Sequence, residues 1–236
     1  MKLHTLILAA GSIAASAFAG VSTPMTAPAP AVEPTLTGWF IAGSFGQLYD
    51  VGKGLDTAAF DTTKYDSSRV GKLDFEMYNL QIGYDLAPIS EGFGMAAYLE
   101  VGYLTGDVSV SAHPRTNLIS PIDFSIDAQI IPVTANFKVE HVIAGPVSAY
   151  LSGGLGYAWT KYSGNDAYSS SSSGGGFYAQ LTSGLIWNIN SQWEVFGGAR
   201  WIYLNDLGGA KVGLNNRAEI KLQDSWAWEV GVRFNF

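Results

Sequence analysis

The last twelve residues of the chain alternate strictly between apolar side chains and polar or small ones. One face of this segment carries Trp226, Trp228, Val230, Val232, Phe234 and Phe236, and the other carries Ser225, Ala227, Glu229, Gly231, Arg233 and Asn235. A period of two residues is the pattern of a β-strand whose two faces meet different surroundings. The segment therefore predicts a strand with one apolar environment and one polar environment, and the chain ends on its apolar face.

Seven earlier segments show the same alternation. They span 38–49, 73–86, 94–105, 123–139, 147–162, 177–189 and 192–204. The fourth changes parity near 130–132, which predicts a β-bulge at Pro132. The connections between segments are alternately short (87–93, 140–146, 190–191) and long (50–72, 106–122, 163–176, 205–224), so all the long ones fall at one end. This organisation predicts an all-β fold, an eight-stranded antiparallel up-and-down transmembrane barrel with short periplasmic turns and long extracellular loops.

The size of the side chains decides which face of the barrel points outward. Alternation alone also fits a soluble barrel with an apolar interior, but an eight-stranded barrel has little room inside for indoles. The apolar faces carry all seven tryptophans, and only 14% of the residues are charged. We therefore expect the apolar faces to meet lipid, with a girdle of aromatic residues near the strand ends that includes Trp39, Trp159, Trp187, Trp193, Trp201 and Trp226. Arginine at Val230 should then be costly, and arginine at Ser152, on the inner face, should be milder if it fits.

The opposite faces are mostly small and polar, and they carry a few charges. These charges are Glu100, Lys138, Glu194, Arg200, Glu229 and Arg233. Isolated charges are costly in a narrow lumen, so we expect these six to pair across it and to plug the barrel. The alternative is a narrow or gated path for small solutes past the same charges.

The amino-terminal residues predict export. Residues 1–19 combine Lys2, an apolar stretch and the Ala17-Phe18-Ala19 cleavage pattern of a signal peptide. Residues 20–36, rich in proline and alanine, predict a periplasmic tether before the barrel at 37–236. The chain has no cysteine, and removal of Lys2 leaves 12 basic against 20 acidic residues, a net charge of 12 − 20 = −8. Nucleic acid is therefore not an expected partner.

Little in the sequence points to catalysis. After loss of the signal peptide the histidines are His113, in a predicted long loop, and His141, in a predicted short turn at the other end. A lipid-modifying barrel enzyme with His113 as base and Ser111 as nucleophile is the least favoured alternative. The prediction is a protein with no catalytic site, no cofactor and no metal.

Two stretches resemble a known family. The final strand, with its terminal Phe236, resembles the last strand of Gram-negative outer-membrane barrels. The run P-V-T-A-N-F-K-V at 132–139, followed by G-P-V-S-A-Y-L-S-G-G-L-G-Y at 145–157, is similar to the fourth and fifth strands of the small outer-membrane β-barrel domain family, which includes porin-like and opacity-type proteins and is related in shape to the transmembrane domain of outer membrane protein A.

The resemblance implies a location and partners. It implies insertion into the cell outer membrane after cleavage of the signal peptide, with Phe234 and Phe236 forming a signal for the barrel-assembly machinery. Membrane lipid and lipopolysaccharide are the implied partners, the latter through loop cations at Lys53, Lys64, Arg69 and Lys72. For activity it implies a structural or surface-interaction protein, with a channel as the alternative.

Overall fold

A computed structural model describes most of the chain from Gly38 to the carboxyl terminus. The described residues are 38–50, 55–56, 65–90, 92–114, 122–164, 169–170, 172–204, 209–212, 216–220 and 225–236. The predicted signal peptide and tether lie outside these ranges. No helix long and apolar enough to span a membrane occurs within them.

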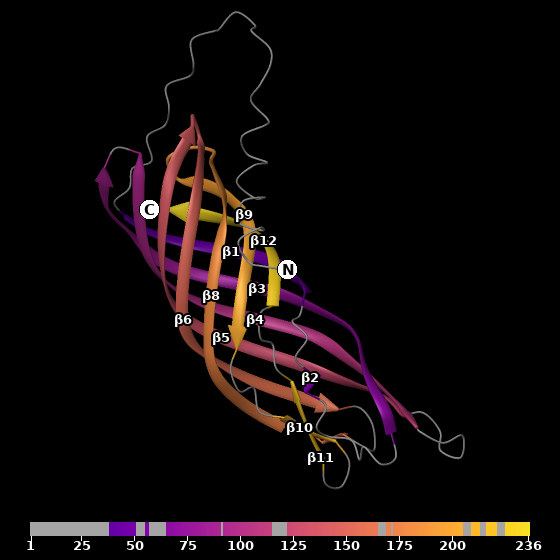
Figure 1. Cartoon of the computed structure of the whole chain (residues 1–236). Coiled ribbons are helices and arrows are strands. Elements are labelled where there is room, and N and C mark those ends of the chain that lie inside the picture. Colours follow the sequence, from indigo (N-terminus) through magenta and orange to yellow (C-terminus); the bar gives the residue numbers. More distant parts are fainter. Residues whose placement is uncertain are drawn as a thin grey trace, which may run out of the picture. The chain divides into compact units, whose positions relative to one another are not determined.

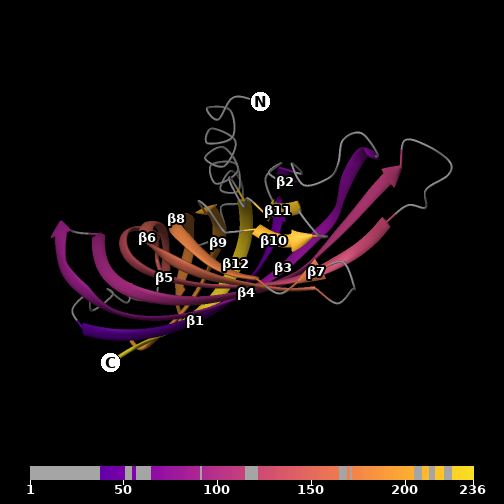
Figure 2. The same ribbon diagram turned by 90° about the horizontal axis from the view of Figure 1, so that it is seen from below.

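Eight strands form a closed antiparallel barrel, as the sequence predicts (Figure 1). They are β1 (Gly38–Asp50), β3 (Tyr65–Ser90), β4 (Phe93–Pro114), β5 (Ile122–Ala144), β6 (Val147–Gly164), β8 (Ser172–Asn188), β9 (Trp193–Leu204) and β12 (Ser225–Asn235). Each strand pairs with its neighbours along the chain, and β12 closes the wall by pairing with β1. Figure 2 gives the view from below, in which these first and last strands lie side by side.

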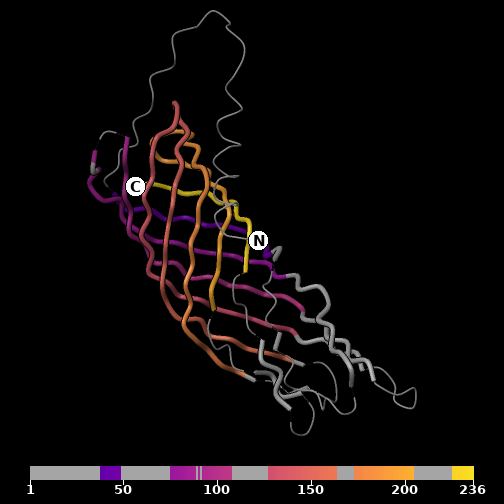
Figure 3. Tube along the Cα trace, in the orientation of Figure 1, coloured from indigo at the N-terminus to yellow at the C-terminus, as the bar shows by residue number. Residues whose placement is uncertain are grey.

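The register fixes the tilt and width of the barrel. Starting at Gly38 and moving from partner to partner once round the wall, the path passes Asp85, Ala96, Lys138, Ser152, Thr182, Arg200 and Ala227 and returns to β1 at Leu48. The stagger is therefore 48 − 38 = 10 residues over eight strands. With strands about 4.8 Å apart and a rise of about 3.3 Å per residue, the tilt is about 40° and the backbone radius about 8 Å. The oblique strands are visible in Figure 3.

One end of the barrel has short connections, and we call it the turn end. Residues 91–92 join β3 to β4, Gly145 and Pro146 join β5 to β6, and residues 189–192 join β8 to β9. Gly92 and Gly145 have φ angles of 77° and 52°, which glycine adopts at little cost. The chain termini of the barrel lie here too, because the Phe236 amide donates to the Trp39 carbonyl at 2.9 Å.

The other end, which we call the loop end, contains more strand than the sequence predicts. Much of the predicted loops 50–72 and 106–122 belongs to β3, β4 and β5, and β3 and β4 stay paired out to Tyr65 and Pro114. The expected loop boundaries were wrong because they were set where outward apolar residues end, whereas β4 continues with Val108 and Val110 on the opposite parity. The predicted loops 50–72, 163–176 and 205–224 share a second sheet of order β2-β11-β10-β7, built from Leu55–Asp56, Asn216–Ile220, Gly209–Val212 and Ser169–Ser170.

The predicted bulge at Pro132 is wrong. The register of β5 with β4 and with β6 is the same on both sides of this residue, and Ile130, Pro132 and Thr134 all point inward. Gly102 on β4 makes room for the proline ring, since a Cβ there would lie 2.8 Å from its Cγ. The strand therefore accommodates proline through a small neighbour instead of an extra residue.

Candidate functional site in the barrel lumen

Buried side chains fill the lumen at successive levels, which the ladder register orders along the axis. Ion pairs lie nearest the turn end, a cavity lies beside them, a polar network lies at the centre, and apolar side chains lie towards the loop end. All six charges predicted to face the lumen are buried in it. Asp85 and Glu140 are also buried in the lumen but were not among the predicted charges, although each lies an even number of residues along its strand from inward-facing Gln81 or Lys138.

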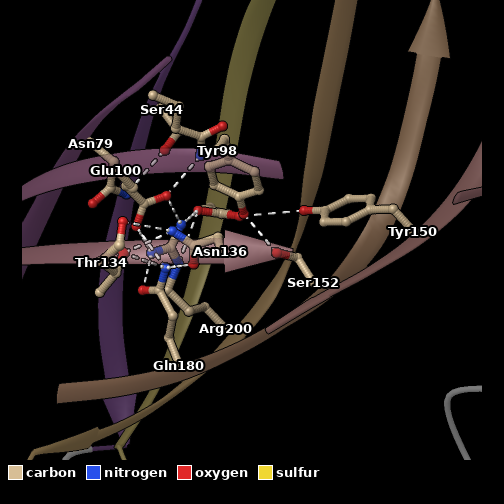
Figure 4. Close-up of polar contacts among 12 residues, drawn as sticks. Ser44, Asn79, Tyr98, Glu100, Thr134, Asn136, Tyr150, Ser152, Gln180 and Arg200 are labelled. Atoms are coloured by element: carbon tan, nitrogen blue, oxygen red, sulfur yellow. Dashed lines mark hydrogen bonds and ion pairs between the residues drawn. The ribbon is translucent and has the colours of Figure 1, made fainter. Parts of the chain in front are cut away.

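Arg200 on β9 is the centre of the polar network and is only 1% exposed. Its Nη1 donates to Glu100 Oε1 at 2.5 Å and to Gln180 Oε1 at 2.6 Å. Its Nη2 donates to Glu229 Oε2 at 2.6 Å and to Glu100 Oε2 at 3.1 Å, and its Nε donates to Glu229 Oε2 at 3.1 Å. Five contacts match the five N–H donors of a guanidinium, so one side chain joins strands β4, β8, β9 and β12 (Figure 4).

Neutral polar side chains complete the network around Glu100. Gln81 Nε2 donates to Glu100 at 2.8 Å, and Gln180 Nε2 donates to it at 2.9 Å. Gln180 Nε2 also lies 2.7 Å from Asn136 Oδ1, and Asn136 donates in turn to Thr134. Four donor contacts saturate the acceptor sites of the Glu100 carboxylate. The charged centre is thus fully hydrogen-bonded, which is what makes buried charge tolerable.

Two smaller ion-pair groups lie near the turn end. Arg233 on β12 donates through Nη2 to Asp85, and its Nε lies 3.5 Å from Glu194 and donates to Asn235 at 2.7 Å. Its guanidinium carbon lies 3.8 Å from the centre of the Phe40 ring, a cation–π contact.

Lys138 forms the second group. Its Nζ lies 2.8 Å from Glu140 Oε2, but the geometry makes this a charge contact and not a well-aligned hydrogen bond.

A cavity of about 30 Å³ lies between the turn-end ion pairs and the central network. Aromatic and aliphatic walls come from Phe40, Tyr98, Tyr150, Ile186 and Phe196, and polar walls come from Gln81, Lys138, Glu194, Glu229 and Arg233. Tyr150 points its hydroxyl at Glu229, 3.3 Å away, and Tyr98 shares a hydrogen bond of 2.6 Å with Ser152. The volume suits one or two water molecules and not an organic substrate.

Above the network, towards the loop end, the lumen is filled mainly by apolar side chains, with the buried hydroxyls of Tyr162, Tyr178 and Ser225 among them. The apolar side chains with almost no exposed surface are Leu48, Phe75, Met77, Leu104, Ile130, Ile202 and Leu204. This apolar level was not expected from the sequence, which predicted small and polar inner faces. The sequence does indicate this level, because Phe75 and Met77 lie on the opposite parity to outward-facing Tyr78 in the predicted strand 73–86 and must therefore point inward.

The outer face carries exposed apolar residues in a band with aromatic residues at both edges. Trp39, Trp187 and Trp193 lie near the turn end, and Trp159, Trp201 and Trp226 lie near the loop end. Phe234 packs between Trp193 and Phe236, and Phe236 is 72% exposed. Beyond the loop-end aromatics, Asp107 pairs in register with Asp127, whose carboxyl hydrogen bond raises the pKa of Asp107. Aqueous surroundings are the natural place for such an acid pair.

The residues considered for catalysis do not form a described site. Ser111 and His113 lie in the extension of β4 and not in a loop, and their side chains are outside the described part of the chain. His141 lies on β5 at the turn end, where its ring stacks on Phe93 at 4.3 Å. Among the described residues, no three His, Cys, Asp or Glu side chains are placed to hold a metal ion.

An apolar outer band, a closed antiparallel wall and a polar, filled lumen define a transmembrane β-barrel. No protein-family model matches the sequence, and no curated protein is similar to it in sequence. Among solved structures the chain is similar to Neisserial surface protein A, with a TM-score of 0.51 and 14% identity over 84% of this chain and 97% of that one. The chain therefore has the fold of the small outer-membrane β-barrels.

Two further solved structures align less closely. Outer membrane protein OprG from Pseudomonas aeruginosa has a TM-score of 0.49 and 15% identity over 84% of this chain and 96% of that one. The outer membrane protease OmpT from Escherichia coli has a TM-score of 0.44 and 9% identity over 85% of this chain and 94% of that one. One fold can carry unrelated activities, so function has to be argued from the lumen and the outer surface.

Proposed function

We propose that the protein is an integral outer-membrane barrel with its turn end in the periplasm and its loop end outside the cell. In this proposal it is a closed structural and surface-interaction protein without catalysis. Lipid and lipopolysaccharide surround the apolar band, and the aromatic carboxyl terminus at Phe236 serves as the signal for the assembly machinery. The shared loop-end sheet supports the surface role, because three long connections contribute strands to it.

The observation that carries the closed state is the occupation of the lumen at two levels in series. Arg200 uses all five donors inside the wall, and the level above it is lined mainly by apolar side chains, among which lie the buried hydroxyls of Tyr178 and Ser225. A narrow apolar constriction resists the entry of water and ions.

The alternative is a narrow or gated channel. It is favoured by one observation, namely that the centre of the lumen is closed by rearrangeable ion pairs and not by apolar packing alone. A lipid-modifying enzyme is less favoured, because no described residues form a catalytic group.

Conductance across planar bilayers separates the two. We expect the purified wild-type barrel to show no discrete openings over the full range of applied voltage, and Arg200→Ala to remain silent because the apolar level is intact. A well-folded wild-type protein that opens in discrete steps, with steps abolished by Glu100→Gln or Arg200→Ala, would establish the channel instead.

A further inference from the structure

We propose that the turn-end half of the lumen is a hydrated, cation-accepting vestibule that ends at the Arg200 network, and that the apolar level beyond the network seals the barrel against permeation. The inference deepens the closed-barrel proposal and rests on it. It concerns the cavity between the two polar levels, and its ligands are water and small monovalent cations.

The first support is polar atoms that lack a protein partner. Arg233 lines the cavity and is 3% exposed, yet its Nη1 donates to no protein atom. Asp85, its ion-pair partner, has an unpartnered Oδ1 and is 4% exposed. Towards the loop end, the buried atoms without a partner include the neutral hydroxyls of Tyr162, Tyr178 and Ser225, which cost less to bury than charged atoms. Buried charged groups that find no protein partner are ordinarily satisfied by ordered water, and a cavity of about 30 Å³ provides the room.

The second support is a difference in accessibility between the cavity and the apolar level. Gln81, Tyr98 and Tyr150, on the cavity wall, keep 8 to 9% of their surface exposed, whereas Ile202 and Leu104, at the apolar level, keep none. Space that water can enter therefore lies around the cavity and not between the apolar side chains.

The third support is an excess of negative charge. The buried ionisable groups of the described lumen comprise five carboxylates (Asp85, Glu100, Glu140, Glu194, Glu229) and three cations (Lys138, Arg200, Arg233), a balance of 3 − 5 = −2. Charges in a low-dielectric lumen call for compensation. A water-filled compartment next to Glu194 and Glu229 allows small cations, and not anions, to supply it.

Silver ions test the vestibule, because Ag⁺ is small, monovalent and reactive with thiols, and the chain has no cysteine to compete. At an introduced cysteine the thiol loses its proton to solvent and a sulfur–silver bond forms. Ile186 lines the cavity and Ile202 lies in the apolar level, and both are buried isoleucines of the inner face. Ile186→Cys and Ile202→Cys are therefore a matched pair, and Ser191→Cys in an exposed turn sets the upper rate.

The variants are folded in detergent micelles in nitrate buffer and exposed to Ag⁺ for timed intervals. They are then unfolded, and the remaining thiols are tagged with a maleimide polymer. We expect Ile186→Cys to react at a rate approaching that of Ser191→Cys, and Ile202→Cys to react roughly 100-fold more slowly, because an unpaired ion is costly in an apolar layer. Adding Glu194→Gln should slow the reaction of Ile186→Cys several-fold.

Equal, slow reaction at both isoleucine positions would show a dry cavity, and equal, fast reaction would show that the apolar level is not a seal; either result overturns the inference. A rate unchanged by Glu194→Gln would overturn the cation preference. Phe196→Cys, also on the cavity wall, repeats the test if Ile186→Cys does not fold. Discrete conductance of the wild-type protein would refute the closed barrel itself, whereas equal silver rates in a silent barrel would refute the vestibule alone.

Discussion

Arg200 holds two carboxylates from different strands, so its removal tests the central network most directly. Arg200→Met would leave Glu100 and Glu229 buried and unpaired. We expect a loss of about 3 to 5 kcal/mol in the free energy of unfolding, as for other broken buried ion pairs. Urea titration of the barrel in lipid vesicles measures it.

Arg200→Lys is the matched control, because lysine keeps the positive charge but lacks the planar guanidinium with its five donors. It should recover only part of the lost free energy of unfolding. The triple variant Arg200→Met/Glu100→Gln/Glu229→Gln should be more stable than Arg200→Met, because the uncompensated charges are gone. If Arg200→Met unfolds within about 1 kcal/mol of the wild type, the network does not contribute to stability as a unit.

The sequence predicted which charged residues face the lumen, but not which of them form ion pairs with each other. Strand parity was enough to place Glu100, Arg200 and Glu229 on the inner face. Which carboxylate meets which cation depends on a stagger of ten residues around the wall, and no local pattern encodes that stagger. Asp85 has inward parity but was left out of the predicted charge set, and its contact with Arg233 across the seam between β1 and β12 depends on the same stagger.

At the scale of strands, glycines on the inner face of β6 allow close approach of its neighbours. A Cβ on Gly156 would overlap the carbonyl oxygen of Val133 on β5, whereas a Cβ on Gly153, on the outer face, would have its nearest neighbour 3.9 Å away. We expect Gly156→Ala to cost about 1 to 3 kcal/mol, because the backbone has to shift.

Gly153→Ala is the control on the same strand and should be nearly neutral. Urea unfolding in vesicles compares the two variants. Equal midpoints would show that β5 can shift away from β6 without loss of stability. Alternation in the sequence predicts that both positions are strand, and even the face of each. It does not predict the contact with Val133, which arises only once the wall is curved and closed.

The extent of the strands was likewise only partly predictable. Outward-facing apolar residues end where the lipid-facing band ends, so they delimit the membrane-facing part of each strand. Beyond the band, alternation continues in β4 at Val108 and Val110 and in β5 at Phe124 and Ile126, but the apolar residues have changed to the opposite parity. Pro132 shows the effect of a neighbouring strand. The sequence predicted a bulge there, but the register is unbroken because Gly102 on β4 leaves room for the proline ring.

For the whole molecule, the decisive question is whether the outer band meets lipid or water. Val230 on β12 is 47% exposed and lies between the two aromatic edges of the band. In a membrane barrel, Val230→Arg should cost about 2 to 4 kcal/mol. In a water-soluble barrel the same change would expose a charge to solvent and cost almost nothing.

The expected control at Ser152 is unsuitable, because Ser152 is buried against Tyr98 and arginine has no room there. Gln129 is a better control, since it is exposed on the outer face of β5 beyond the loop-end aromatics. Gln129→Arg should cost only about 0 to 1 kcal/mol near the interface. Both variants are unfolded by urea in lipid vesicles, with the mobility shift between folded and boiled samples confirming that each barrel has formed. A Val230→Arg variant as stable as Gln129→Arg would mean that the aromatic-edged band does not face hydrocarbon.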